Sequence, residues 1–307
     1  MKKSYFPEGG IWLKGNIHSH STVSDGMFTP EQLAGLYTSA GYDFLSVTDH
    51  NVLVPHDALS GEQLLLLTGL EHDIEYDADK CVHVVGLAAP GKRETDYLCK
   101  RYSAQELTAQ RLIDMMREDG QFVSLAHPVW SRMEPEEIEG LRGFHTVEVF
   151  NNGTEHLCHG GNAEIFWDLL LRHGKRVLAT AVDDVHVVDD LFGGWVWVKA
   201  AERSEQAVLE ALFSGAFYPS AGPVIHDFGV EDGSAYVSCS DCREIHFVTY
   251  PPRGCSFFAQ ENSPLKEASH TLTGREAYVR AVCVDEEGRS AWTNPIFFDE
   301  RAKDPLR

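Results

Sequence analysis

Histidine and acidic side chains stand at the ends of short apolar runs in the first two-thirds of the chain. Two of these endings hold metal-ligand residue types two positions apart, and side chains at positions i and i+2 of a strand share a face. One such pair is weak evidence, but five endings in order are hard to obtain by chance. The pattern predicts one metal centre built from several strand ends. The endings are Ile17-His18-Ser19-His20, Val47-Thr48-Asp49-His50, Gly69-Leu70-Glu71, Ala126-His127-Pro128 and Asp184-Val185-His186.

The apolar runs alternate with amphipathic stretches, which favours a β/α repeat with a mainly parallel sheet or barrel. In an α/β barrel the carboxyl ends of the strands meet on one face, so separate polar ends become one cluster. Capping residues predict helix starts at Thr29-Pro30-Glu31-Gln32, Ser103-Ala104-Gln105-Glu106 and Ser204-Glu205. The predicted strands cover residues 11–17, 44–47, 64–70, 82–87, 122–126, 146–150, 177–182 and 195–198.

A change of pattern follows residues 219–223. Apolar and polar residues then alternate, and Asp232-Gly233 and Glu287-Gly288 are typical of turns. We therefore expect two domains, an α/β domain over residues 1–222 and a small antiparallel β-sandwich domain over residues 223–307. A single continuous sheet running through both regions would overturn this division into separate domains.

The formal net charge of −21 arises from 26 Lys and Arg residues against 47 Asp and Glu residues. Such a surface repels nucleic-acid polymers and anionic membranes, so neither is expected as a partner. An anionic substrate would need a local positive feature, which metal ions can supply. Apolar stretches are far shorter than the roughly 18 residues of a membrane span. Without an apolar segment after the first charges, and with seven scattered cysteines, we expect a cytoplasmic protein with reduced thiols.

Several motifs resemble, in order and spacing, the PHP (polymerase and histidinol phosphatase) family of metal-dependent phosphoesterases. The likeness covers roughly residues 11–200 and is closest to the stand-alone branch that includes carbaryl-hydrolase-like proteins. It implies a distorted seven-stranded β/α barrel. The motifs are Asn16-Ile17-His18-Ser19-His20-Ser21, Ser24-Asp25-Gly26, Thr48-Asp49-His50-Asn51, Gly69-Leu70-Glu71, His83, Ala126-His127-Pro128 and Asp184-Val185-His186.

The resemblance implies nine metal ligands and two or three divalent ions. Asp184 is taken as a ligand rather than Asp183, because it keeps the Asp-x-His spacing to His186. Asp25 stands where some relatives with three ions have histidine. The implied groups are His18, His20, Glu71 and Asp184 around a first ion, Glu71 bridging to a second ion with His83 and His127, and Asp25, His50 and His186 around a third.

Six imidazoles and three carboxylates suit Zn²⁺, Mn²⁺ or Fe²⁺ at an open catalytic site, whereas a structural zinc site is usually closed and often contains cysteine. Two or three such ions against three carboxylates leave a positive charge that could bind an anionic substrate. A bound metal also lowers the pKa of water from about 15.7 to about 7. We predict Glu71, Asp184 and His186 as the catalytic residues.

Other polar residues near these motifs are weaker candidates. Arg132 could bind a phosphate and Trp130 could form a pocket wall, with Asn151 as a further substrate-binding residue. Asp49 and Asp183 could orient imidazoles, although a buried strand end would look the same. His72 should point away from the site because it follows Glu71 on a strand. His156 and His159 have a chelating spacing but lie in a predicted loop entering a helix.

The leading interpretation is a metal-dependent hydrolase of a small, anionic phosphate mono- or diester. A hydrolase of carbamate or carboxylate esters is the first alternative, since the same activated water attacks either centre. A pocket dominated by Trp130 without a working Arg132 would favour it. A metal-stabilised binding module without turnover is the second alternative, from a different class. The presence of all nine implied ligands argues against it.

Overall fold

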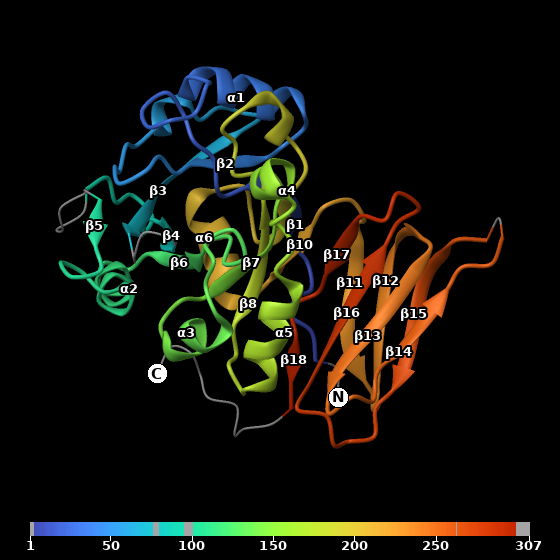
Figure 1. The fold of residues 1–307 in the computed structure, drawn as a ribbon. Helices are drawn as coiled ribbons and strands as arrows, with labels where there is room; N and C mark the ends of the chain where they lie inside the picture. The colour runs from blue at the N-terminus through green and yellow to red at the C-terminus, as the bar shows by residue number, and fades with distance from the viewer. Residues whose placement is uncertain (1–2, 76–79, 95–100, 262, 299–307) are drawn as a thin grey trace.

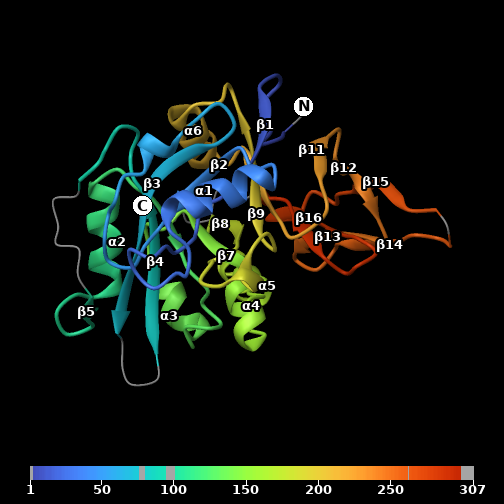
Figure 2. The same cartoon turned by 90° about the horizontal axis from the view of Figure 1, so that it is seen from above.

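The computed structural model describes residues 3–75, 80–94, 101–261 and 263–298. A larger part with helices and strands lies beside a smaller part made of strands, shown in orange and red in Figure 1. The view from above in Figure 2 shows the same arrangement, with the β-strand part next to β9. In the described part of the chain, no helix is both long enough and apolar enough to cross a bilayer.

Seven strands of the larger part follow one another in a single sheet, in the order β1-β2-β3-β4-β6-β7-β8. All neighbours are parallel except β4, which is antiparallel to both β3 and β6. A parallel bridge between Ser19 and Val185 brings the chain after β1 against the chain after β8. The strands are β1 (Ile11–Asn16), β2 (Phe44–Val47), β3 (Leu65–Glu75), β4 (Cys81–Leu87), β6 (Phe122–Leu125), β7 (Thr146–Asn151) and β8 (Leu178–Val182).

Two strands differ from the sequence prediction. β3 continues to Glu75, so Glu71 lies inside the strand and does not follow its end. The reason is that β4 pairs over its whole length with the second part of β3, from Gly69 opposite Leu87 to Glu75 opposite Cys81. The short β5 (Tyr102–Ser103) pairs with the end of β3, where a helix start had been predicted.

The helices lie in the connections between consecutive strands of the chain. The predicted capping box at Thr29 and Gln32 is confirmed, and Ser204 caps α6 as predicted. The prediction at Ser103 is wrong, because Thr108 caps α2 while Ser103 lies in β5. The helices are α1 (Pro30–Ser39), α2 (Ala109–Glu118), α3 (Pro135–Gly140), α4 (Asn152–Cys158), α5 (Glu164–Arg172) and α6 (Glu205–Ser214), with 3₁₀ turns η1 (Asp57–Leu59) and η2 (Val188–Asp190).

The smaller part has two antiparallel sheets that share one apolar core. One sheet is β11 (Ile225–Glu231), β12 (Ser234–Cys242) and β15 (Leu265–Thr271). The core lies between the sheets and includes Phe228, Val237, Phe247 and Ala281. The opposing strands are β13 (Glu244–Tyr250), β14 (Cys255–Phe258), β16 (Tyr278–Val284), β17 (Ser290–Trp292) and β18 (Ile296–Phe297).

The two parts are joined by hydrogen-bonded strands. β9 (Trp195–Ala200) is antiparallel to β1, and β10 (Phe217–Ser220) is antiparallel to β9. β10 then pairs with β17 at one position, Ser220 opposite Ala291. The large sheet is therefore continuous through both regions, contrary to the expectation of separate sheets. The domain boundary at residue 222 remains a prediction, because the sheet does not break there.

A partly buried imidazole near the sheet, that of His145, makes stability depend on pH. His145 Nδ1 accepts a 2.9 Å hydrogen bond from the Val123 N–H, and its ring stacks on Phe122. Burial lowers the pKa of His145 to about 4. Because the folded pKa lies below the unfolded value near 6.5, this neutral ring contributes stability above pH 6.5 that is lost as pH falls towards 4.

We expect wild type to lose up to about 3 kcal/mol of unfolding free energy relative to His145→Asn between pH 6.5 and pH 4. Asparagine keeps an acceptor for the Val123 N–H but does not titrate. Urea denaturation of both proteins across this range measures the difference. A constant difference at all pH values would contradict the assignment.

Candidate metal centre

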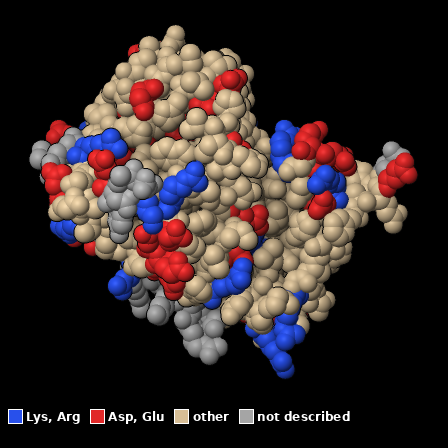
Figure 3. All heavy atoms as spheres, viewed as in Figure 1, with Lys and Arg blue, Asp and Glu red and all other residues tan. Residues whose placement is uncertain are grey.

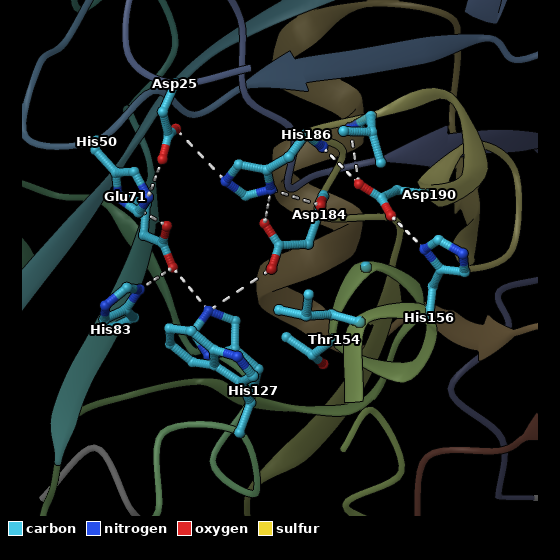
Figure 4. A pocket seen from close by; sticks show the side chains of 14 residues that line it. Asp25, His50, Glu71, His83, His127, Thr154, His156, Asp184, His186 and Asp190 are labelled. Carbon is cyan, nitrogen blue, oxygen red and sulfur yellow. Dashed lines mark hydrogen bonds and ion pairs between the residues drawn. The ribbon is translucent and has the colours of Figure 1, made fainter. Parts of the chain in front are cut away.

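All nine predicted ligands come together on one side of the larger sheet. His18 and His20 follow β1, His50 follows β2, Glu71 and His83 lie on β3 and β4, and the others follow strand ends or lie in loops. Their donor atoms form overlapping groups in which every atom lies within 4.8 Å of the others. Figure 4 shows those of them that line the pocket, from Asp25 and His50 to Asp184 and His186. The groups are His20, Asp25, His50 and His186; His18, His127 and Asp184; His18, His20 and Glu71; and His50, Glu71 and His83.

Glu71 lies at the centre of the cluster and presents one oxygen to each of two sets of histidines. Its Oε2 is 3.3 Å from His18 Nε2, 3.2 Å from His20 Nε2 and 3.1 Å from His50 Nδ1. Its Oε1 is 3.0 Å from His83 Nδ1 and 3.2 Å from His127 Nε2. A carboxylate in this position has the geometry of a bridge between two cations.

Asp184 faces the same histidines from the opposite side. Its Oδ1 lies 3.2 Å from His18 Nε2 and 3.1 Å from His20 Nε2, and its Oδ2 lies 3.7 Å from His127 Nε2. The four side chains predicted around the first ion therefore converge. Asp184 has a φ of 52° and His127 a φ of 23°, values that non-glycine residues rarely adopt. Such strained backbone is concentrated at functional sites, and here it lies at two strand ends that carry predicted ligands.

The third group is more open to solvent. Asp25 Oδ2 lies 3.7 Å from His50 Nε2, and Asp25 Oδ1 lies 3.5 Å from His186 Nε2. The side chain of Asp25 is 55% exposed, whereas that of Glu71 is 1% exposed. An ion in this group would be less enclosed than one held by Glu71.

Several donor atoms of the cluster are buried without a hydrogen-bond partner in the described part of the chain. Glu71 Oε2, Asp184 Oδ1 and His50 Nδ1 are buried and have no hydrogen-bond partner among the described residues. Buried polar atoms are normally satisfied, so these three call for a partner. Donors around a tetrahedral cation at about 2.1 Å lie about 3.4 Å apart, close to the 3.1–3.3 Å spacings in the inner groups. The residues therefore fit divalent cations.

The carboxylates also attract protons to this cluster. Burial opposes protonation of His20, but Asp184 and Glu71 raise its pKa to about 9. Burial likewise opposes protonation of His83, but the Glu71 carboxylate raises the pKa of this imidazole to about 10. Burial alone would raise the pKa of Glu71, but His18, His83 and His127 hold it well below its usual range. A metal ion would compete with protons for the same imidazoles, because it binds their neutral form.

Glu148 is a buried carboxylate that the sequence analysis missed. Its Oε1 accepts a 2.7 Å hydrogen bond from His18 Nδ1, and its Oε2 accepts a 2.9 Å bond from the His127 N–H. A carboxylate behind a ligand imidazole fixes the ring orientation and the tautomer. The signal in the sequence was an acidic residue between Val147 and Val149 on a strand that is otherwise largely apolar.

Asn151 was predicted to bind substrate, but the structure gives it another role. It is fully buried, and its Nδ2 donates to Glu148 Oε2 at 2.9 Å and to Asp184 Oδ2 at 3.0 Å. Its Oδ1 accepts the Thr154 N–H and caps α4. Asn151 thus holds two carboxylates in place and is not among the residues that line the cavity.

Within the described residues, Asp49 and Asp183 accept hydrogen bonds from hydroxyl and backbone groups and not from imidazoles. Asp49 accepts bonds of 2.7 Å from Ser21 and Ser24 and so fixes the loop that carries Asp25. Asp183 accepts a 2.5 Å bond from the Tyr37 hydroxyl and backbone bonds from residues 192 and 194. Both carboxylates orient loops that carry predicted ligands. His72 is buried outside the ligand groups, as predicted.

The cluster opens into a cavity of about 430 Å³. Trp130 lines it and contacts the rings of His83 and His127 edge-to-face, as expected of a wall residue. The prediction for Arg132 is not met, because Arg132 is exposed and is not among the lining residues. It lies in a turn after Pro128 with a left-handed φ of 59°, a conformation that the sequence does not reveal.

No family model matches the chain. The 5'-3' exoribonuclease Rnm of Salmonella typhimurium is 32% identical to it over 111 residues, which are 32% of this chain and 37% of that protein. The match therefore covers about a third of this curated relative.

Three solved structures resemble the chain. A two-domain Bacteroides vulgatus protein, described as containing a predicted PHP-like metal-dependent phosphoesterase, is 16% identical with a TM-score of 0.47 and covers 96% of this chain and 98% of that one. A proposed metal-dependent phosphoesterase from Bifidobacterium adolescentis is 19% identical with a TM-score of 0.41, covering 59% and 89%. An amidohydrolase from Chromobacterium violaceum is 16% identical with a TM-score of 0.41, covering 56% and 87%.

Proposed function

We propose that the chain is a PHP-family hydrolase that uses two or three divalent ions to cleave a small phosphate mono- or diester. The observation that carries this proposal is the position of Glu71, with one oxygen towards each of two histidine sets. The seven strands from β1 to β8 and the Ser19–Val185 bridge support a distorted seven-stranded barrel. We assign residues 1–222 to this domain and residues 223–307 to an accessory β-sandwich in a cytoplasmic protein.

Within this proposal the protein holds the ions, the water and the substrate in fixed positions. Bound Zn²⁺, Mn²⁺ or Fe²⁺ would activate water and stabilise the charge of a phosphoryl group. Glu71 and Asp184 hold the histidine donors from two sides, and Glu148 fixes the His18 ring. Asp25, His50 and His186 would complete a third, more open site.

The size and charge of the site favour a small substrate. The cavity of about 430 Å³ suits a metabolite, and no Lys or Arg of the described chain lines it. Figure 3 shows the Lys and Arg side chains of one face in separate small groups among acidic residues. With a net charge of −21, this surface offers little to a nucleic-acid polymer. The ions themselves would neutralise the phosphate.

A second candidate function is the hydrolysis of carbamate or carboxylate esters. Trp130 lines the cavity while Arg132 lies outside it, which is the arrangement expected for an uncharged substrate. The same ions and the same water would serve either reaction.

Esters that share one leaving group separate the candidates. The purified protein is assayed with p-nitrophenyl phosphate, bis(p-nitrophenyl) phosphate, p-nitrophenyl acetate and a p-nitrophenyl carbamate, after chelation and after addition of Mn²⁺, Zn²⁺ or Fe²⁺. We expect phosphate-ester turnover that disappears on chelation and returns with metal. Turnover of only the acetate or carbamate would establish the second candidate. Tight metal binding without any turnover would indicate a non-catalytic binding module.

A further inference from the structure

One imidazole of the cavity is not needed as a ligand. His156 lies on α4 and lines the same cavity as His50, His127 and Asp184. Apart from the predicted ligands, the described lining residues with an ionisable side chain are His156 and Asp190, and the other five are apolar, glycine or threonine. Of this pair, His156 has the imidazole, the side chain that most often serves as a general acid.

A buried carboxylate lies beside this imidazole. His156 Nδ1 lies 3.3 Å from Asp190 Oδ1, and Figure 4 marks this contact with a dashed line. Asp190 is itself held, because its Oδ2 accepts the backbone N–H groups of His186 at 2.9 Å and Val187 at 2.8 Å. Asn152, at the start of α4, also donates to the Asp190 carbonyl at 2.9 Å. These contacts tie α4 to the segment that carries Asp184 and His186.

With Nδ1 facing Asp190, Nε2 is the ring nitrogen left to exchange a proton with a ligand. The second charged group that faces the ring is the exposed Asp189, whose Oδ2 lies 3.9 Å from Nε2. The side chain of His156 is 50% exposed, so a substrate can reach it.

We propose that His156 protonates the leaving oxygen of the substrate, an inference that rests on the proposed phosphoesterase function. The oxygen of a water molecule forms a bond to phosphorus. The bond from phosphorus to the ester oxygen breaks, and its electron pair stays with the leaving oxygen. The proton on His156 Nε2 moves to that oxygen, so the alcohol leaves neutral and the ring becomes neutral. The proton lost by the water passes to solvent, from which His156 is recharged.

This role identifies a substrate class. A leaving oxygen needs a proton most when its parent alcohol is a weak acid, so the substrate is a phosphate ester of an aliphatic alcohol and not an anhydride or an activated aryl ester. Two largely exposed apolar residues flank the pair. Leu157 follows His156 and is 70% exposed, and Val187 follows His186 and is 44% exposed. Both line the cavity and would contact the carbon body of the alcohol.

The test compares His156→Gln with wild type on esters of graded leaving group, namely p-nitrophenyl phosphate, phenyl phosphate and an alkyl phosphate. We expect kcat on the alkyl ester to fall about 10²- to 10⁴-fold, as for loss of a general acid, while p-nitrophenyl phosphate changes only a few-fold. Bound metal should equal that of wild type. His159→Gln is the matched control, because His159 is 92% exposed near the same helix and does not line the cavity.

A readout without turnover comes from nitrogen NMR of the metal-free wild type, in which the neutral His156 ring should carry its proton on Nδ1. A proton on Nε2 instead, or an equal loss of rate on all three esters, would overturn the role of His156. If wild type cleaves no phosphate ester under any metal condition, the proposed function fails and this inference fails with it. Selective loss on the alkyl ester supports both.

Discussion

Glu71→Gln should abolish most of the phosphoesterase activity and lower the number of bound metal ions. Glutamine replaces one anionic oxygen with an NH₂ group that cannot ligate, so one of the two histidine sets around Glu71 loses its shared donor. Mutation of a residue that only orients a metal ligand typically lowers metal affinity or activity about 10- to 100-fold. We expect the turnover of Glu71→Gln to fall by about another factor of ten or more. Metal analysis and turnover of the same preparation measure both effects.

His186→Ala is the informative comparison for Glu71→Gln. His186 belongs to the open group with Asp25, so its loss should remove at most one ion and leave the inner groups filled. Near wild-type turnover and full metal content in Glu71→Gln would refute the bridging role. The main support for a two-metal hydrolytic mechanism would then be gone.

Glu148→Gln should weaken metal binding about 10- to 100-fold without removing any ligand. Both Glu148 oxygens accept hydrogen bonds, from His18 Nδ1 on one side and from the His127 N–H and Asn151 on the other. In Glu148→Gln, the NH₂ group in either position would face one of these N–H donors. Two donors cannot share a hydrogen bond, so His18 or His127 must shift. A metal titration followed by activity should show a higher metal requirement, with much of the rate restored at saturating metal.

Glu210→Gln provides the control, because Glu210 is an exposed glutamate on α6 outside the cluster. Its metal titration should match that of wild type. If Glu148→Gln also matches wild type, the His18 ring does not depend on Glu148 for its orientation.

The spacing of the metal-ligand residue types predicted the location of the candidate site, because the strand ends of a β/α fold must meet on one face. The nine residues singled out at His18 to His186 do lie together. The sequence could not show that Glu71 lies inside β3. That position depends on β3 and β4 forming a hairpin that extends to Glu75 opposite Cys81, past the end of the apolar run.

Residues that act through others were harder to predict. Glu148 was recognisable as an acid between two valines, whereas Asn151 required knowledge of how β7 lies beside Asp184. Arg132 was misplaced because its direction depends on a left-handed turn that most residues avoid. His156 followed from helix spacing only as a weak candidate, and its partner Asp190 lies 34 positions along the chain.

The contact between the two parts of the chain limits how the protein can be shortened. Trp12, Trp197 and Tyr218 of the larger part pack into the apolar core of the C-terminal sheets, and Trp12 and Tyr218 meet edge-to-face at 5.4 Å. A fragment that ends at residue 222 would leave these rings in water and would free the edge of β10, which normally pairs with β17. An unpaired edge beside an apolar surface promotes association with other chains. The larger part is therefore better studied within the whole chain than as an excised piece.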